Sequence, residues 1–196
     1  MSRVRHIVSC KVLKTLYKTL ISSYLVYCNV SWGEANIYLL QNMFILQKQA
    51  IRICAGSNYR SSSSPLFSKL RLLNLVDIIK FQTAMFMYKI KYNLMLQRCL
   101  HFAAVNNTKH SHNTRKFNYF VEVYFCTSIW ASSLSVRGPK VWNSLPSDIS
   151  DTAYLGGFKP NLITVFLPID CVSSKMFPHV HYSYHFHLFY FWLFIS

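Results

Sequence analysis

The sequence predicts a mainly α-helical protein, followed by a smaller irregular region with short strands and then by an ill-defined C-terminal tail. Three observations support this fold class. Apolar residues recur every three or four positions in three long segments of residues 1–98. Turn-forming residues separate these segments. The helical period weakens from residue 99 onward, and residues 164–196 show neither a helical nor an alternating period.

The chain is strongly basic. Its 196 residues include 21 Lys and Arg against 6 Asp and Glu, a net charge of +15. Such a charge favours phosphate-rich partners or an anionic membrane surface. Residues 1–160 hold 20 of the 21 basic residues, whereas residues 161–196 hold only Lys175 and Asp170 among the charged types. The character of the chain therefore changes near residue 160.

The first long segment, residues 8–28, is expected to be an amphipathic helix. Its apolar face consists of Leu13, Leu16, Leu20, Tyr24 and Tyr27. Three lysines, Lys11, Lys14 and Lys18, fall together on the opposite face. Two interpretations of this lysine face remain open: it is the solvated side of an amphipathic helix, or it is a stripe that follows phosphates.

A second helix is expected from about Ala35 to Cys54, with Gly56 just beyond it as the C-terminal cap. Lys48 and Arg52, four residues apart, lie at the edge of its apolar face. That face consists of Ile37, Leu40, Phe44 and Ile51.

A loop and a third long helix complete the first half. The stretch NYRSSSSP, residues 58–65, is rich in turn formers, and residues 66–73 form a short amphipathic piece after it. The third helix is expected over residues 77–92. Its first turn holds Asp77 and its last turn holds Lys89 and Lys91, as the helix dipole favours.

The region from residue 99 to 163 is predicted to be less regular. Residues 119–125, YFVEVYF, alternate as a short strand does. The stretch RGPKVWNSLP, residues 137–146, is expected to form a corner at its Gly-Pro pair. Two apolar side chains, Trp142 and Leu145, are expected to face a small core there.

The cysteines and histidines do not show the spacing that is usual for metal ligands. The cysteines are too far apart to pair on one metal, so each is interpreted as a small buried hydrophobic residue: Cys10, Cys28, Cys54, Cys99, Cys126 and Cys171. Three histidine pairs have a strand-like spacing, but the last two lack a nearby carboxylate or cysteine: His110 with His112, His179 with His181, and His185 with His187. No metal site and no cofactor is predicted.

The two ends of the chain carry no clear targeting or spanning segment. Residues 7–15 include Cys10, Lys11 and Lys14 instead of the apolar core of a secretory signal, so an intracellular protein, nuclear or cytoplasmic, is expected. The last apolar run, residues 188–195, is shorter than the ~20 residues of a membrane-spanning helix. The tail is interpreted either as an interfacial anchor or as an unstructured or accidental segment.

Five motifs in a fixed order point to a family. They are LKTLYKTLISSYLVYCNVSWG (13–33), LQKQAIRICAG (46–56), SPLFSKLRLLNLVDIIKFQTAMFMYK (64–89), HNTRK (112–116) and RGPKVWNSLP (137–146). In sequence and order they resemble the region after the polymerase palm of non-LTR retrotransposon reverse transcriptases, of the jockey-type, LINE-like group. The resemblance covers roughly residues 10–160.

The resemblance implies a helical thumb-like segment in residues 1–98 and a basic post-thumb region in residues 99–163, which help to hold template and primer. It does not imply polymerisation. A palm holds two metal ions on adjacent aspartates, whereas the aspartates here lie apart, at positions 77, 148, 151 and 170. The palm, the fingers and the endonuclease domain are expected upstream of Met1. The chain is therefore predicted not to be an enzyme, and the missing palm of the parent RNA-directed DNA polymerase is an expected partner.

The sequence departs from the family pattern at three places. Ser23 stands where proline is usual and Cys28 where glycine is common. After residue 162 the resemblance stops, although the family continues with another Lys-rich helix. We interpret residues 164–196 as unrelated to the family, arising from a frameshift, a splice or read-through.

Basic residues interleaved with aromatic residues are the remaining functional signal, because Lys and Arg contact phosphates and aromatic rings stack on bases. The aromatic residues Tyr24, Tyr27 and Trp32 are interpreted as core. The predicted function is nonspecific RNA or DNA binding by a non-catalytic polymerase fragment. The alternative is a membrane-surface protein anchored by its aromatic tail. The predicted phosphate contacts are Lys11, Lys14, Lys18, Lys48, Arg52, Arg115, Lys116, Arg137 and Lys140.

Overall fold

The computed structural model describes residues 6–33, 35, 37–95, 119–124 and 126–167. These residues are mainly helical, which confirms the predicted fold class, and none of them forms a strand. In chain order the elements are α1 Cys10–Leu16, η2 Tyr17–Ser22, α2 Ser23–Val26, α3 Asn29–Trp32, α4 Ile37–Ala55, α5 Ser64–Leu70, α6 Leu75–Lys91, α7 Ser128–Ala131, α8 Leu134–Asn143, α9 Ser147–Ser150 and α10 Leu155–Phe166.

The two long helices begin and end where local chemistry favours it. Gly56 follows α4 with a φ of 65°, the left-handed conformation of a glycine cap. At the start of α6 the side chain of Asn74 accepts a hydrogen bond of 2.9 Å from the backbone N–H of Asp77. Asp77 lies in the first turn of α6, and Lys89 and Lys91 lie in its last. Both helices were predicted to within two residues at each end.

The first helical stretch contains a π-helical turn that decides which residues face the core. The elements α1, η2 and α2 follow one another without a break. Their inward residues are four apart: Leu13, Tyr17, Ile21 and Leu25. In a regular α-helix of 3.6 residues per turn such a series drifts around the axis. The wider turn of η2 rotates the later residues back toward the core.

The predicted apolar face of this stretch is therefore wrong in its second half. Leu20 is 54 % exposed, Tyr24 79 % and Tyr27 53 %. The interpretation of Tyr24 and Tyr27 as core residues is also wrong. Trp32 is half-buried and packs against the cluster formed by α2 and α6.

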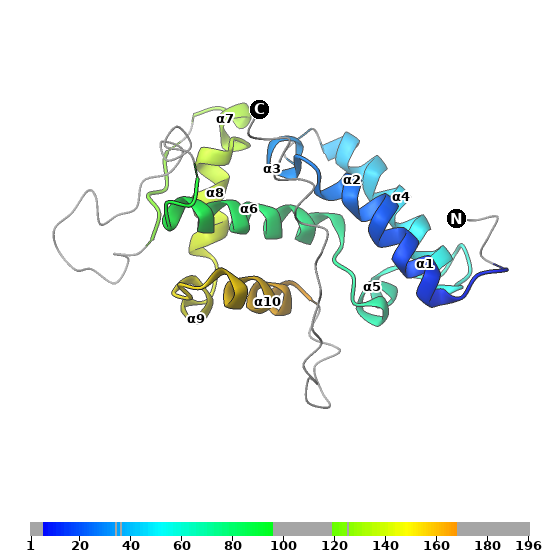
Figure 1. Ribbon diagram of the computed structural model, residues 1–196. Helices are drawn as coiled ribbons and strands as arrows, with labels where there is room; N and C mark the ends of the chain where they lie inside the picture. The colour runs from blue at the N-terminus through cyan, green and yellow to red at the C-terminus, as the bar shows by residue number, and fades with distance from the viewer. Residues whose placement is uncertain (1–5, 34, 36, 96–118, 125, 168–196) are drawn as a thin grey trace, which may run out of the picture.

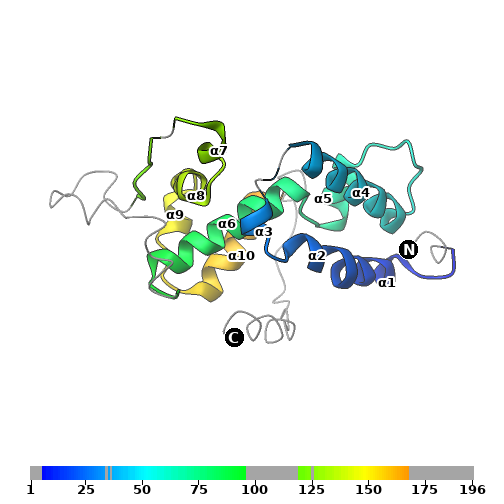
Figure 2. The ribbon, with the colours of Figure 1, turned by 90° about the horizontal axis from the view of Figure 1, so that it is seen from above.

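Helix α6 is the central element, and it contacts both halves of the fold (Figures 1 and 2). Its N-terminal half packs Leu75, Ile78 and Ile79 against α2, α3 and α4. Its C-terminal half packs against α8, α9 and α10. A further cluster joins α1, α4 and α5. Between these clusters, buried Gln47 donates hydrogen bonds from Nε2 to the Tyr17 hydroxyl at 2.9 Å and to the Leu73 carbonyl at 3.1 Å.

The corner predicted at Gly138-Pro139 is wrong, because α8 runs through both residues. Proline inside a helix removes one hydrogen bond of the ladder, but here the helix buries Gly138 and Pro139 against α6. A Cβ at Gly138 would lie 2.5 Å from the Met87 sulfur, so glycine permits this close approach. The inward direction of Trp142 and Leu145 was predicted correctly, since they are 2 % and 7 % exposed.

The strand expected at residues 119–125 is not formed by the described residues 119–124. The backbone of Phe120 makes two hydrogen bonds with a side chain of α8. The Phe120 N–H donates to Asn143 Oδ1 at 3.1 Å, and Asn143 Nδ2 donates to the Phe120 carbonyl at 3.0 Å. The amide of Asn143 thus holds the Phe120 backbone at the end of α8.

Other expectations fall partly outside the described residues. Helix α10 continues beyond residue 163, and the rest of the tail, from residue 168, lies outside them. Several predictions also concern residues outside the described part of the chain: the boundary at residues 98–99, Cys99, Cys171 and the three histidine pairs. Of the remaining cysteines, Cys54 is buried as predicted, but Cys10 and Cys126 are exposed and Cys28 is half-buried, so the interpretation of those three is wrong.

Cys28 has an unusual backbone. Its φ of 48° and ψ of 24° are left-handed, and it is the N-cap residue of the short helix α3. A side chain with a Cβ is strained in this conformation by about 1–2 kcal/mol. Glycine adopts it freely, although glycine loses more backbone entropy on folding.

Replacing Cys28 by glycine is therefore expected to raise the free energy of unfolding by about 0.5–1 kcal/mol. The gain would be measured as a higher midpoint in urea, followed by far-ultraviolet circular dichroism. Cys28→Ala is the matched control, because it removes the thiol and keeps the Cβ, and it should give no gain. Equal stabilisation by both variants would attribute the effect to the thiol and contradict the argument from backbone strain.

Candidate nucleic-acid interface

Three basic side chains lie at the surface, and two of them are near enough to the third to lower its pKa. They are Lys14 of α1, Lys18 of η2 and Arg71, which follows α5, and we call them the basic cluster. Burial lowers the pKa of Lys14, and the positive charges of Lys18 and then Arg71 lower it further. Lys18 and Arg71 are exposed, whereas Lys14 is half-buried. Like charges gathered in this way are stabilised by an anion.

The turn at the end of α5 determines the position of Arg71. Arg71 is left-handed, with a φ of 51°. Its N–H donates to the Ser68 carbonyl at 3.0 Å, and the Leu72 N–H donates to the Phe67 carbonyl at 3.0 Å. These bonds form a Schellman motif, in which Leu72 also packs with Phe67 in one core cluster. The turn thus directs the chain away from α5 at Arg71.

Of the lysine face predicted on the first helix, Lys14 and Lys18 belong to the basic cluster. Lys11 and Lys18 are exposed, and Lys14 and Lys18 are close enough to influence each other's charge. Arg71 was missed. It lies more than fifty positions from Lys18 in the sequence, and a helix period cannot bring together residues from two elements.

The predicted contacts on α4 have other partners. The Lys48 ammonium lies over the Phe44 ring, 3.9 Å from its centroid. The Arg52 Nε donates a hydrogen bond of 2.9 Å to the Ser61 carbonyl, and its guanidinium lies 5.9 Å from the Tyr59 ring. Arg52 thus holds the loop between α4 and α5 against the end of α4.

The predicted contacts on α8 differ from each other. Lys140 is exposed. The Arg137 Nη2 donates to the Val30 carbonyl of α3 at 3.5 Å, and burial lowers the pKa of Arg137 to about 10. Arg137 thus links α8 to α3. The other two predicted contacts, Arg115 and Lys116, lie outside the described residues.

Two further lysines, Lys89 of α6 and Lys159 of α10, lie near enough for their charges to interact. Burial lowers the pKa of Lys159, and the positive charge of Lys89 lowers it further. Neither lysine was predicted as a phosphate contact. The two lysines are seventy positions apart, and α10 was not predicted as a helix.

Nearby Lys91 has a structural role. Its ammonium donates to the Ser150 carbonyl at the end of α9 at 2.9 Å and lies 3.8 Å from an Asp151 carboxylate oxygen. Burial lowers the pKa of Lys91, while Asp151 raises it. The Tyr88 hydroxyl donates to the Ala153 carbonyl at 2.6 Å. The end of α6 is thus tied to the turn after α9.

Among the described residues, no three His, Cys, Asp or Glu side chains are grouped so that they could hold a metal ion. No helix in that part of the chain is long and apolar enough to cross a membrane. The chain matches no protein-family model, no curated protein and no solved structure.

Proposed function

We propose that this chain is a non-catalytic fragment of a non-LTR reverse transcriptase that binds RNA or DNA nonspecifically through clustered basic residues. The observation that carries the proposal is the basic cluster. Lys14, Lys18 and Arg71 come from different elements, and the charges that lower the pKa of Lys14 are both positive. A polyphosphate backbone supplies the opposite charge at several adjacent points, whatever its base sequence.

Two backbone features support the family resemblance. The resemblance has glycine common at position 28, and Cys28 adopts the left-handed conformation that glycine favours. It has proline usual at position 23, and the π-helical turn ends at Ser22, directly before that position. Proline breaks the hydrogen-bond ladder of a helix in the same way. The departures at Ser23 and Cys28 thus coincide with irregularities of the backbone.

The proposal predicts salt-dependent binding. Labelled single-stranded RNA and DNA of unrelated sequences should bind with similar affinity. The logarithm of the binding constant should fall linearly with the logarithm of salt concentration between ~50 and ~200 mM, with a slope on the order of −2 for three phosphate contacts. Fluorescence anisotropy would measure it. Binding that is insensitive to salt, or selective for one sequence, would contradict nonspecific phosphate contact.

A membrane-surface role is the second candidate, and the exposed apolar side chains of η2, α2 and α4 favour it. These include Leu20, Tyr24, Tyr38, Leu39 and Leu46. Basic and apolar residues together suit an anionic lipid surface. Co-sedimentation with vesicles of phosphatidylcholine and phosphatidylserine tests this role. Strong vesicle binding without binding to nucleic acid would favour it over the first proposal.

A further inference from the structure

Two cysteines far apart in the sequence meet where the start of α1 packs on the end of α4. Cys10 is the first residue of α1, and Cys54 lies in the last turn of α4. The Cys10 thiol donates to the Cys54 carbonyl, with the sulfur 3.1 Å from the oxygen. The Cys54 thiol donates to the Leu13 carbonyl at 3.6 Å, one turn into α1. Each sulfur thus touches the backbone of the helix that carries the other.

The two thiols differ in access. Cys10 is exposed, whereas Cys54 is 0 % exposed within the cluster of α1, α4 and α5. Burial raises the pKa of Cys54 to about 11, so an oxidant in solution reaches Cys10 first and reacts there more readily. A rotation of the Cys10 side chain moves its sulfur away from the Cys54 carbonyl without moving the helix.

We propose that Cys10 and Cys54 form a reversible disulfide that fastens α1 to α4 under oxidising conditions. The oxidant is a small-molecule disulfide such as glutathione disulfide. The Cys10 thiolate attacks one sulfur of the oxidant, forming a mixed disulfide and releasing one glutathione thiolate. The Cys54 thiolate then attacks the Cys10 sulfur, forming the protein disulfide and releasing the second glutathione. The two thiol protons pass to the released thiolates, so two thiols are oxidised and one disulfide is reduced.

Mild oxidation of the full chain with glutathione disulfide tests the proposal. Intact mass should fall by two hydrogens, and peptide mapping without reductant should join the Cys10 and Cys54 peptides. Closing a loop of this length should raise Tm by about 10 °C, and dithiothreitol should reverse the rise.

Variants at cysteines outside the buried core keep the test independent of folding. Cys10→Ser should abolish the bridge and the rise in Tm. The double variant Cys28→Ser with Cys126→Ser removes two thiols outside this contact and should retain both. A bridge to any other cysteine, a stable glutathione adduct on Cys10, or a bridge without a rise in Tm would overturn the proposal.

Discussion

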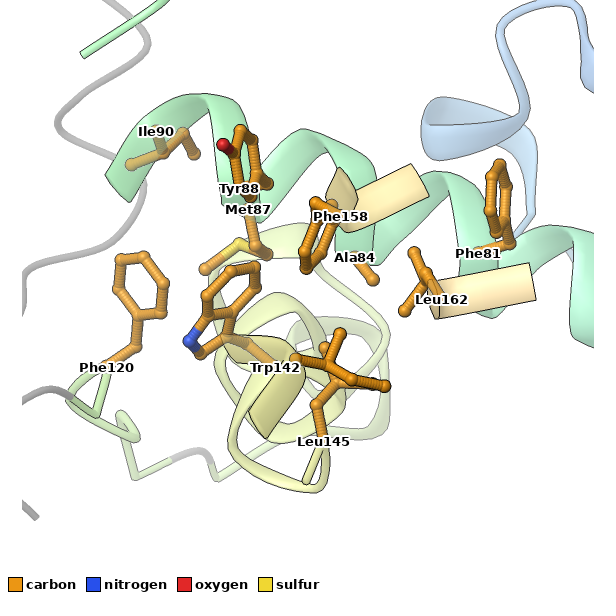
Figure 3. Close-up of a cluster of buried hydrophobic side chains, with 11 residues drawn as sticks. Phe81, Ala84, Met87, Tyr88, Ile90, Phe120, Trp142, Leu145, Phe158 and Leu162 are labelled. Carbon is orange, nitrogen blue, oxygen red and sulfur yellow. The ribbon is translucent and has the colours of Figure 1, made fainter. Parts of the chain in front are cut away.

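Replacing Trp142 by alanine is expected to lower the free energy of unfolding by about 3–5 kcal/mol. Trp142 is 2 % exposed and lies at the centre of the cluster between α6, α8 and α10 (Figure 3). Its ring centroid is 5.8 Å from that of Phe120, 5.7 Å from that of Phe158 and 6.4 Å from that of Tyr88. Removal of the indole leaves a cavity lined by three aromatic rings that the backbone cannot easily fill.

The loss is large relative to the ~5–15 kcal/mol that stabilises most domains. Urea unfolding followed by circular dichroism would measure it. Trp130→Ala is the matched control, because Trp130 is 52 % exposed on α7, and its loss should change stability by less than ~0.5 kcal/mol. A variant of Trp142 as stable as the variant of Trp130 would mean that α8 does not depend on this cluster.

The long helices could be predicted from the sequence because their start and end signals are local. Asn74 and Asp77 mark the beginning of α6, and Gly56 marks the end of α4. Each signal acts within a few residues of the chain. The direction of the first helix's faces could not be predicted in the same way, because a period of 3.6 residues does not include the π-helical turn at Tyr17–Ser22.

In the α8 segment, the helix-breaking residues glycine and proline led to a wrong prediction. Gly138 and Pro139 were interpreted as a corner, yet Val136, Pro139 and Trp142 are buried at successive spacings of three residues, as on one face of a helix. That spacing was the signal that could have found the helix. The packing of the helix against Met87 and the burial of Trp142 outweigh the lost hydrogen bond of Pro139.

The candidate site was predictable only where one helix carries it. Lys11, Lys14 and Lys18 share a helix, so their common face follows from their spacing. Tertiary packing brings Arg71 near Lys14, and it likewise brings Lys89 of α6 near Lys159 of α10. Conversely, spacing alone gave no sign that Arg52 and Arg137 hydrogen-bond to backbone carbonyls of other segments.

The basic cluster offers the sharpest test of nucleic-acid binding, because two of its members are exposed and can be changed without disturbing the core. The double variant Lys18→Gln with Arg71→Gln is expected to lower affinity for single-stranded RNA about tenfold or more near 0.1 M salt. The salt slope should become less steep by about 1.4, since each lost phosphate contact to a single strand removes about 0.7.

The control for this variant removes the same charges elsewhere. Arg60→Gln with Lys80→Gln also replaces one exposed arginine and one exposed lysine, outside the basic cluster. If binding depends on the arrangement of the charges, this control should change the salt slope far less than the cluster variant does. Equal losses in the two variants would mean that the net charge of +15 alone attracts the nucleic acid. Anisotropy titrations at several salt concentrations distinguish these outcomes, and circular dichroism of each variant shows whether the fold is retained.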